Sequence, residues 1–156
     1  MKVDYTKFKY MDDVESWFGK ITVNTNNTSK EISVRIIDDL DDLGKIPQAG
    51  KDALEFFIDN YDKYKEVILE TVYDYYDYRK SAWGGDDPDD PKYPDVKNAE
   101  EVYEMMTLSS IIIGYKYNPG KHDIHFIYDC TFEEEGVGIC MTNLNVDEIG
   151  IQGIAV

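Results

Sequence analysis

The chain has 156 residues, of which 42% are apolar, and its 32 acidic residues outnumber 16 lysines and arginines to give a formal charge of −16. This length and apolar content support one ordinary hydrophobic core, so we expect residues 1–156 to form a single domain. The charge disfavours nucleic acid and anionic membrane surfaces as partners and favours a basic protein, because opposite fields speed association. The alternative is that the acidity serves solubility alone.

Apolar runs are short throughout the chain. The longest is centred on residues 111–113, and residues 1–13 contain no run that could act as a signal sequence. The sequence therefore predicts a cytoplasmic protein without a membrane span. Cys130 and Cys140 are too few for a disulfide scaffold and lack metal-ligand spacing, so we expect reduced thiols, with a pair across a hairpin as the alternative.

The first third of the chain is typical of a β-hairpin. Apolar residues alternate with polar ones in residues 17–25 and again in residues 32–36, and the polar residues 26–29 between them favour a turn. Residues 1–13 alternate more loosely, which predicts an edge strand or an extended lead-in.

Residues 47–79 have the periodicity of a helix. The run is longer than a domain of this size is wide, so we expect a bend or break near Asn60, and both one long helix and two nearly collinear helices remain open. Apolar side chains recur at steps of three and four, which places them on one helical face: Leu54, Phe57, Ile58, Tyr61, Tyr64, Ile68, Val72, and Tyr75 or Tyr76.

The remainder predicts a loop, a short helix and four strands. Residues 84–97 contain three prolines and five aspartates and are expected to be exposed, whereas residues 97–106 favour a helix capped by Asn98. Four β-rich runs with short separators then predict an antiparallel meander: residues 110–117, 123–132, 137–143 and 148–154.

Together these elements predict an α+β fold. The order is β-β-α-α-β-β-β-β, with an antiparallel sheet of about six strands and the long helix, or two collinear helices, packed on one face. Ile37, Ile112 and Ile127 would point to the other face. We therefore expect a small helix, the tail or a partner to cover that face.

Metal and catalytic sites have weak support in the sequence. The aspartate-rich loop lacks calcium-loop spacing, because Pro91 and Lys97 stand where a glycine and a glutamate are needed. His122 and His125 are three residues apart and would face opposite sides of a strand, so they cannot share a metal. We expect no metal and no cofactor; the alternative is a small metal-dependent or acid/base hydrolase using a histidine with residues 133–135.

Tyrosines and aspartates gather near the end of the long helical run. Tyr73, Tyr75, Tyr76 and Tyr78 cannot all share one helical face, so one or two must look outward beside Asp74 and Asp77. Tyr93 and Trp83 flank the acidic loop and could extend the same surface. The residues predicted to contact a basic partner are Asp86, Asp87, Asp89, Asp90, Tyr75, Tyr76 and Tyr78.

The C-terminal third also resembles a known family. Residues 126–139 are similar to the hairpin of an uncharacterised bacterial family whose Cys-x-Trp-Asp-Glu-Glu-His-Gly-Leu-Gly-Val motif precedes a last strand ending in glycine, here Gly150. Residues 17–19 and 48–54 fit the same family. This chain departs from the motif at the tryptophan and histidine, where it has Phe132 and Glu135.

The resemblance implies a binding role. Members of families that look like this are often found beside polymorphic toxin genes and are taken to be immunity proteins, whereas others have no assigned role. The leading hypothesis is therefore a non-enzymatic immunity protein that occludes a basic toxin domain. A homo-oligomeric structural module joined through the outer sheet face is a further alternative, and Gly136 and Gly138 favour a structural role for the motif, as a tight turn and a close backbone approach.

Overall fold

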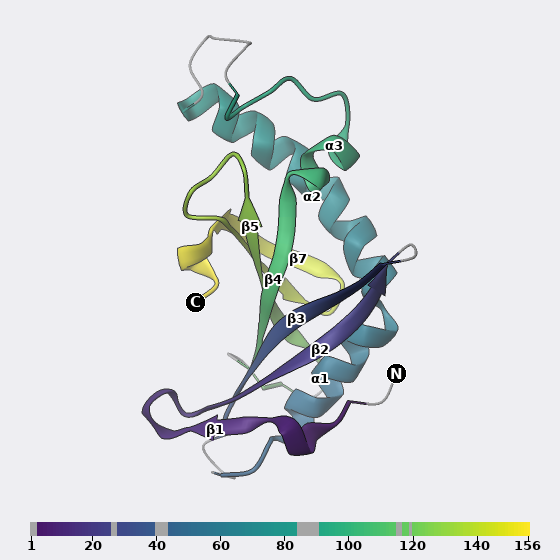
Figure 1. The fold of residues 1–156 in the computed structure, drawn as a ribbon, viewed down its shortest axis with the longest axis vertical. Helices are drawn as coiled ribbons and strands as arrows, with labels where there is room; N and C mark the ends of the chain where they lie inside the picture. Colours follow the sequence, from purple (N-terminus) through teal and green to yellow (C-terminus); the bar gives the residue numbers. More distant parts are fainter. Residues whose placement is uncertain (1–2, 26–27, 40–43, 84–90, 115–116, 119) are drawn as a thin grey trace.

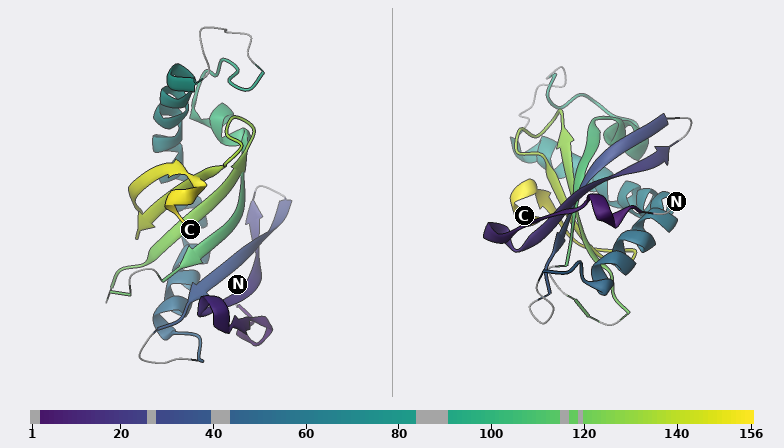
Figure 2. Two further views of the ribbon diagram at one scale, coloured as in Figure 1. Left: turned by 90° about the vertical axis from the view of Figure 1, so that its left-hand side faces the viewer. Right: turned by 60° about the horizontal axis from the view of Figure 1, so that its bottom comes forward.

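The structure is a computed structural model that describes residues 3–25, 28–39, 44–83, 91–114, 117–118 and 120–156. In this part of the chain one sheet runs in the order β1-β2-β3-β4-β5-β6-β7, with the helices on one side of it (Figures 1 and 2). The strands are β1 (Lys9–Met11), β2 (Ser16–Thr25), β3 (Thr28–Ile37), β4 (Met106–Ile113), β5 (Asp123–Cys130), β6 (Val137–Thr142) and β7 (Asn145–Ile151). The helices are α1 (Gln48–Asp59), α2 (Tyr61–Trp83) and α3 (Ala99–Glu104), and the short 3-10 turns are η1 (Tyr5–Lys7), η2 (Asp12–Val14) and η3 (Gln152–Ile154).

The strand pairing confirms the α+β class and corrects two details. The described sheet has seven strands rather than six, because β1 adds a short edge next to β2. Neighbouring strands are antiparallel, as predicted, except for β3 and β4, which are parallel. The helices lie between these two strands in the chain, and such a crossover returns the chain to the end of the sheet where β3 began.

Asn60 divides the predicted long helix into α1 and α2, which confirms the expected break. The Asn60 backbone N–H and its side-chain Nδ2 both donate to the carbonyl oxygen of Phe56, at 3.0 and 2.8 Å. Its own carbonyl accepts from Tyr64 N at 3.0 Å. One residue therefore ends α1 and begins the hydrogen-bond ladder of α2.

Apolar side chains of α1 and α2 form the core against the inner sheet face. Phe57 and Tyr64 place their ring centroids 5.6 and 5.3 Å from that of Phe126 on β5. Six residues of the apolar face predicted for the helical run are buried, as expected. These are Leu54, Phe57, Tyr64, Ile68, Val72 and Tyr76, which meet Val34, Ile111, Phe126 and Ile139 of the sheet.

The C-terminal turn η3 covers part of the outer sheet face. Ala155 and Ile154 pack on Ile112, Ile127 and Cys140 in a second, smaller apolar cluster. The prediction that the tail or a small helix covers these isoleucines is confirmed for this part of the sheet. The hydrophobic effect thus fixes the end of the chain on the side opposite the helices.

The motif glycines make room for this cover. Gly136 has φ +67°, a conformation that favours glycine, and a Cβ there would lie 2.4 Å from the carbonyl oxygen of Tyr128. A Cβ on Gly138 would lie 2.9 Å from Cβ of Ala155. Gln152 Nε2 donates to that same Tyr128 carbonyl at 2.9 Å. The geometry agrees with a structural role for both glycines.

Several predicted boundaries and contacts are different in the structure. Strand β4 begins at Met106 rather than residue 110, because Met106 and Leu108 alternate into the core and shorten α3. Cys140 lies opposite His125, so it does not face Cys130 across a hairpin, and both thiols are free. Tyr93 is buried, so the segment predicted as an exposed loop is anchored there. No helix among the described residues has the length and apolarity that a membrane crossing requires.

Candidate functional site

The outward side of α2 carries all five acidic residues of that helix. Successive acids at three- or four-residue steps lie on one side of an α-helix, and each of them is exposed here. Two exposed tyrosines accompany them, Tyr73 at 37% and Tyr78 at 65%. We call this surface the acidic stripe: Asp62, Glu66, Glu70, Tyr73, Asp74, Asp77 and Tyr78.

Cations of α2 do little to neutralise the acidic stripe. Lys80 pairs with Asp95, and Arg79 pairs with Glu133, which lies at the β5–β6 turn. Lys65 lies 4.0 Å from Glu100 of α3 and 5.3 Å from the centre of the Tyr103 ring. Among the described side chains of α2, Lys63 is the one exposed cation. The stripe therefore keeps most of its negative charge.

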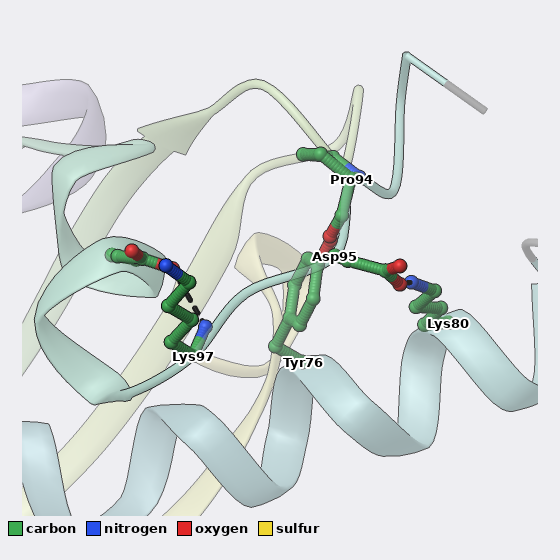
Figure 3. Close-up of polar contacts among 6 residues, drawn as sticks. Tyr76, Lys80, Pro94, Asp95 and Lys97 are labelled. Atoms are coloured by element: carbon green, nitrogen blue, oxygen red, sulfur yellow. Dashed lines mark hydrogen bonds and ion pairs between the residues drawn. The ribbon is translucent and has the colours of Figure 1, made fainter. Parts of the chain in front are cut away.

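Tyr76 fixes the C-terminal half of α2 to the rest of the fold. Its hydroxyl donates to the carbonyl oxygen of Pro94, as Figure 3 shows beside the Lys80–Asp95 ion pair. Its ring centroid is 5.0 Å from that of Phe132 in an edge-to-face arrangement and 6.0 Å from that of Tyr93. These aromatic contacts attach α2, the helix with the acidic stripe, to the core.

The segment after Asp95 is held by a helix cap. Asn98 Oδ1 accepts from Glu101 N at 3.0 Å, which confirms Asn98 as the cap of α3. The Glu101 side chain accepts in turn from Lys97 N at 2.6 Å (Figure 3). The polypeptide beside the stripe is thus fixed by its own hydrogen bonds.

The predicted contact residues have different positions in the structure. Asp86, Asp87, Asp89 and Asp90 lie outside the described residues, as does the side chain of Trp83. Tyr78 is exposed, but Tyr76 is 1% exposed and Tyr93 is buried, so these two rings belong to the core and not to the surface.

Tyr75 is half-buried, and its hydroxyl is buried without a hydrogen-bond partner among the described residues. Burial raises the pKa of Tyr75 to about 12. Tyr73 and the acids Asp62, Glu66 and Glu70 are exposed but were not among the predicted contact residues. The four-residue spacing of those acids is the sequence pattern that predicts them on one exposed side of the helix.

A second, smaller polar site surrounds His125 on the outer sheet face. A cavity of about 430 Å³ is lined there by Asp123, His125, Cys140, Asp147 and Glu148, among others. Nδ1 of His125 lies 3.1 Å from the carbonyl oxygen of Ala155, and Nε2 lies 3.4 Å from Asp123 Oδ1. Burial lowers the pKa of His125, but the hydrogen bonds to Asp123 and Ala155 raise it, and the net direction is upward.

This polar site is poorly arranged for acid/base or nucleophilic chemistry. Both ring nitrogens of His125 are directed at protein oxygens, so neither is poised to take a proton from a substrate. Burial, followed by the charge of Glu148, raises the pKa of Cys140 to about 11, which keeps the thiol protonated near neutral pH. Among the described residues no group of three or more His, Cys, Asp or Glu side chains could hold a metal ion.

The residues considered for the hydrolase alternative are dispersed. His122 stacks on Phe56 of α1, with ring centroids 4.5 Å apart, on the opposite side of the sheet from His125. Glu133 is buried and paired with Arg79. Glu134 and Glu135 are exposed. None of the three lines the His125 cavity.

Comparison with known proteins gives a family and no established activity. No curated protein matches the chain, and no solved structure matches it. One family matches residues 4–156, and it is described as a domain of unknown function. Since the match covers almost the whole chain, the protein belongs to this family, DUF6985.

Proposed function

We propose that the chain is a non-enzymatic protein-binding domain that docks a basic protein on the acidic stripe of α2. The observation that carries the proposal is the alignment of five carboxylates and two exposed tyrosines on α2. Most cations of this helix pair with carboxylates outside the stripe. Opposite charge steers a basic partner toward such a surface. Tyrosine adds a large, stiff contact area with a polar tip.

The alignment of the acids opposes helix stability. Asp62 with Glu66, Glu66 with Glu70, and Glu70 with Asp74 are like-charged pairs four residues apart. Each such pair destabilises a helix by about 0.2–0.5 kcal/mol. Solubility requires only net charge, which dispersed acids provide without this cost. A local negative field directed at a partner is a reason to keep the acids together.

The partner that fits best is a toxin domain with a basic surface. This part of the proposal rests on the resemblance of residues 126–139 to families taken to be immunity proteins. Occlusion by an acidic surface would neutralise such a toxin without any chemical step. A stable complex of this kind buries on the order of 1,600 Å² in total, so the stripe would form the centre of a larger contact.

The test is association with the product of the gene beside that of this protein. Its rate is measured by stopped-flow fluorescence at several salt concentrations for the wild-type protein and for Asp74→Asn/Asp77→Asn. We expect the variant to associate about three- to tenfold more slowly at low salt and with a weaker salt dependence.

The matched control is Asp12→Asn/Asp13→Asn, which changes the net charge equally at exposed residues of η2. It should associate at nearly the wild-type rate. Equal slowing by both variants would assign the effect to net charge alone. Association that is unchanged in both and insensitive to salt would refute docking on the stripe.

A further inference from the structure

The part of the outer sheet face that η3 leaves open forms a cavity of about 1,060 Å³. Its floor comes from β2, β3 and β4, and its wall comes from η1 and β1, which lie toward the other end of the sheet from the C-terminal turn (Figure 2). We call this cavity the basic groove. Its lining includes Lys7, Lys9, Phe18, Lys20, Arg35 and Ile112.

Strand register explains how these side chains come together. Residues paired across neighbouring strands share a sheet face. Lys9 lies opposite Phe18, Phe18 opposite Arg35, and Arg35 opposite Ile112. The row continues through His125 and Cys140, where η3 covers it. The basic groove is therefore the uncovered half of one continuous row across the sheet.

Arg35 is held in a fixed position at the centre of the groove. Its Nε donates to Ser16 Oγ at 2.9 Å, and its guanidinium carbon lies 5.8 Å from the centre of the Phe18 ring. Among the described residues, neither Arg35 nor Lys9 forms an ion pair with a carboxylate. A cation that is ordered in advance loses little conformational entropy when an anionic group binds beside it.

The charge of the groove is opposite to that of the chain. Among its described lining residues, four are cations and Glu31 is the one acid. Glu31 pairs with Lys20 at 3.2 Å, but both side chains are 64% exposed, and a surface pair of this kind contributes little and exchanges readily. The groove therefore presents positive charge on a partly apolar floor, in a protein whose formal charge is −16.

Strand β2 also offers backbone beside the groove. β1 pairs only with Ser16, Trp17 and Phe18, so in the described part of the chain the rest of β2 has a strand partner on its β3 side alone. An extended segment can add to such an edge through main-chain hydrogen bonds. Lys20 and Thr22, on that part of β2, line the groove.

We propose that the basic groove binds a short, extended, acidic segment of a partner protein. Its carboxylates would meet Lys9, Lys20 and Arg35, and its apolar side chains would meet Phe18 and Ile112. A segment fits the observations better than a nucleic acid does, because a long polyanion would extend beyond the groove and meet the surrounding acids. This site is independent of the acidic stripe.

The test is an amide NMR titration with a peptide of about ten residues that alternates glutamate with valine, which would span roughly 33 Å when extended. Its matched control replaces each glutamate with glutamine. We expect the acidic peptide to shift the resonances of Lys9, Phe18, Lys20 and Arg35, and the neutral peptide to bind at least about fivefold more weakly.

The protein variants locate the site. Lys9→Gln/Lys20→Gln should weaken the acidic peptide about five- to tenfold, whereas Lys63→Gln/Lys121→Gln, which removes two exposed cations outside the groove, should leave binding within about twofold. Arg35 is left in place because its hydrogen bond to Ser16 supports the sheet.

Four results would overturn the proposal. They are no binding of the acidic peptide up to about 1 mM, equal binding of the two peptides, shifts that map away from the groove, and equal loss in both protein variants. Tighter binding of an oligothymidine at the same residues would assign the groove to nucleic acid. Self-association in sedimentation that the groove variant abolishes would assign it to a second copy of this chain.

Discussion

The two sides of the molecule carry opposite local charge. On the helical side, α2 presents five exposed carboxylates and a single exposed cation, Lys63. On the outer sheet face, the described lining of the basic groove has four cations and one acid, Glu31. Charges exposed to solvent are screened over about 8 Å at physiological salt, so a docking group responds to the side it approaches. A formal charge of −16 therefore does not describe what either surface can recognise.

The two sides also differ in how they are supported. The acidic stripe lies on a helix that Tyr76 and its aromatic neighbours attach to the core. The sheet face is divided by the C-terminal turn, which covers His125 and Cys140 and leaves Arg35 open. Three changes test this comparison.

The largest effect is expected at the base of the acidic stripe. Tyr76→Ala removes a ring that is 1% exposed, together with its hydrogen bond to Pro94, and should lower the free energy of unfolding by about 3–5 kcal/mol. Urea denaturation followed by circular dichroism measures the change. The matched variant Tyr78→Ala, at a side chain 65% exposed, should change stability by less than about 0.5 kcal/mol. Similar losses in both variants would mean that the two tyrosines do not divide between core and surface.

An intermediate effect is expected at the covered part of the sheet. The pKa of His125 is raised in the folded protein despite burial, because Asp123 and the Ala155 carbonyl stabilise the protonated ring. A raised folded-state pKa gives stability that is present below the unfolded value and is lost as pH rises through the folded value. The free energy of unfolding should therefore fall as the pH is raised from about 6 to about 8.

Urea denaturation at a series of pH values measures this dependence. The slope should be smaller in His125→Gln, which cannot titrate, and in Asp123→Asn, which removes the charged partner. An unchanged slope in both variants would mean that the contact between His125 and the C-terminal turn does not couple to pH.

The smallest effect is expected within the acidic stripe, and its sign is opposite. Glu70→Gln removes repulsion with Glu66 and with Asp74 and should raise the free energy of unfolding by about 0.5 kcal/mol. Thermal denaturation at low salt measures it, and the gain should shrink at high salt. A loss of stability would mean that Glu70 makes a favourable contact and that the aligned acids need no functional explanation.

Local patterns predicted most of the elements correctly. The alternation in β2 and β3, the helical spacing from Leu54 to Tyr76 and the cap at Asn98 each depend on neighbouring residues. The break at Asn60 was predictable because a single helix over residues 47–79 would be longer than a domain of this size is wide. A cover over Ile112 was predictable because its strand carries apolar residues on both faces. Helix periodicity also places the acids of the stripe on one side of α2. The predicted contacts on this helix were instead tyrosines, and one of them, Tyr76, is buried.

What the sequence by itself determined is the α+β class, the approximate positions of the turns and the excess of negative charge. Tertiary structure alone decided the parallel pairing of β3 with β4, the burial of Tyr93 and the meeting of Lys9, Lys20 and Arg35. The physical reason is that these contacts join segments far apart in the chain, and their register follows from how the whole sheet packs. The same register places Lys9, Lys20 and Arg35 in one groove of an acidic protein.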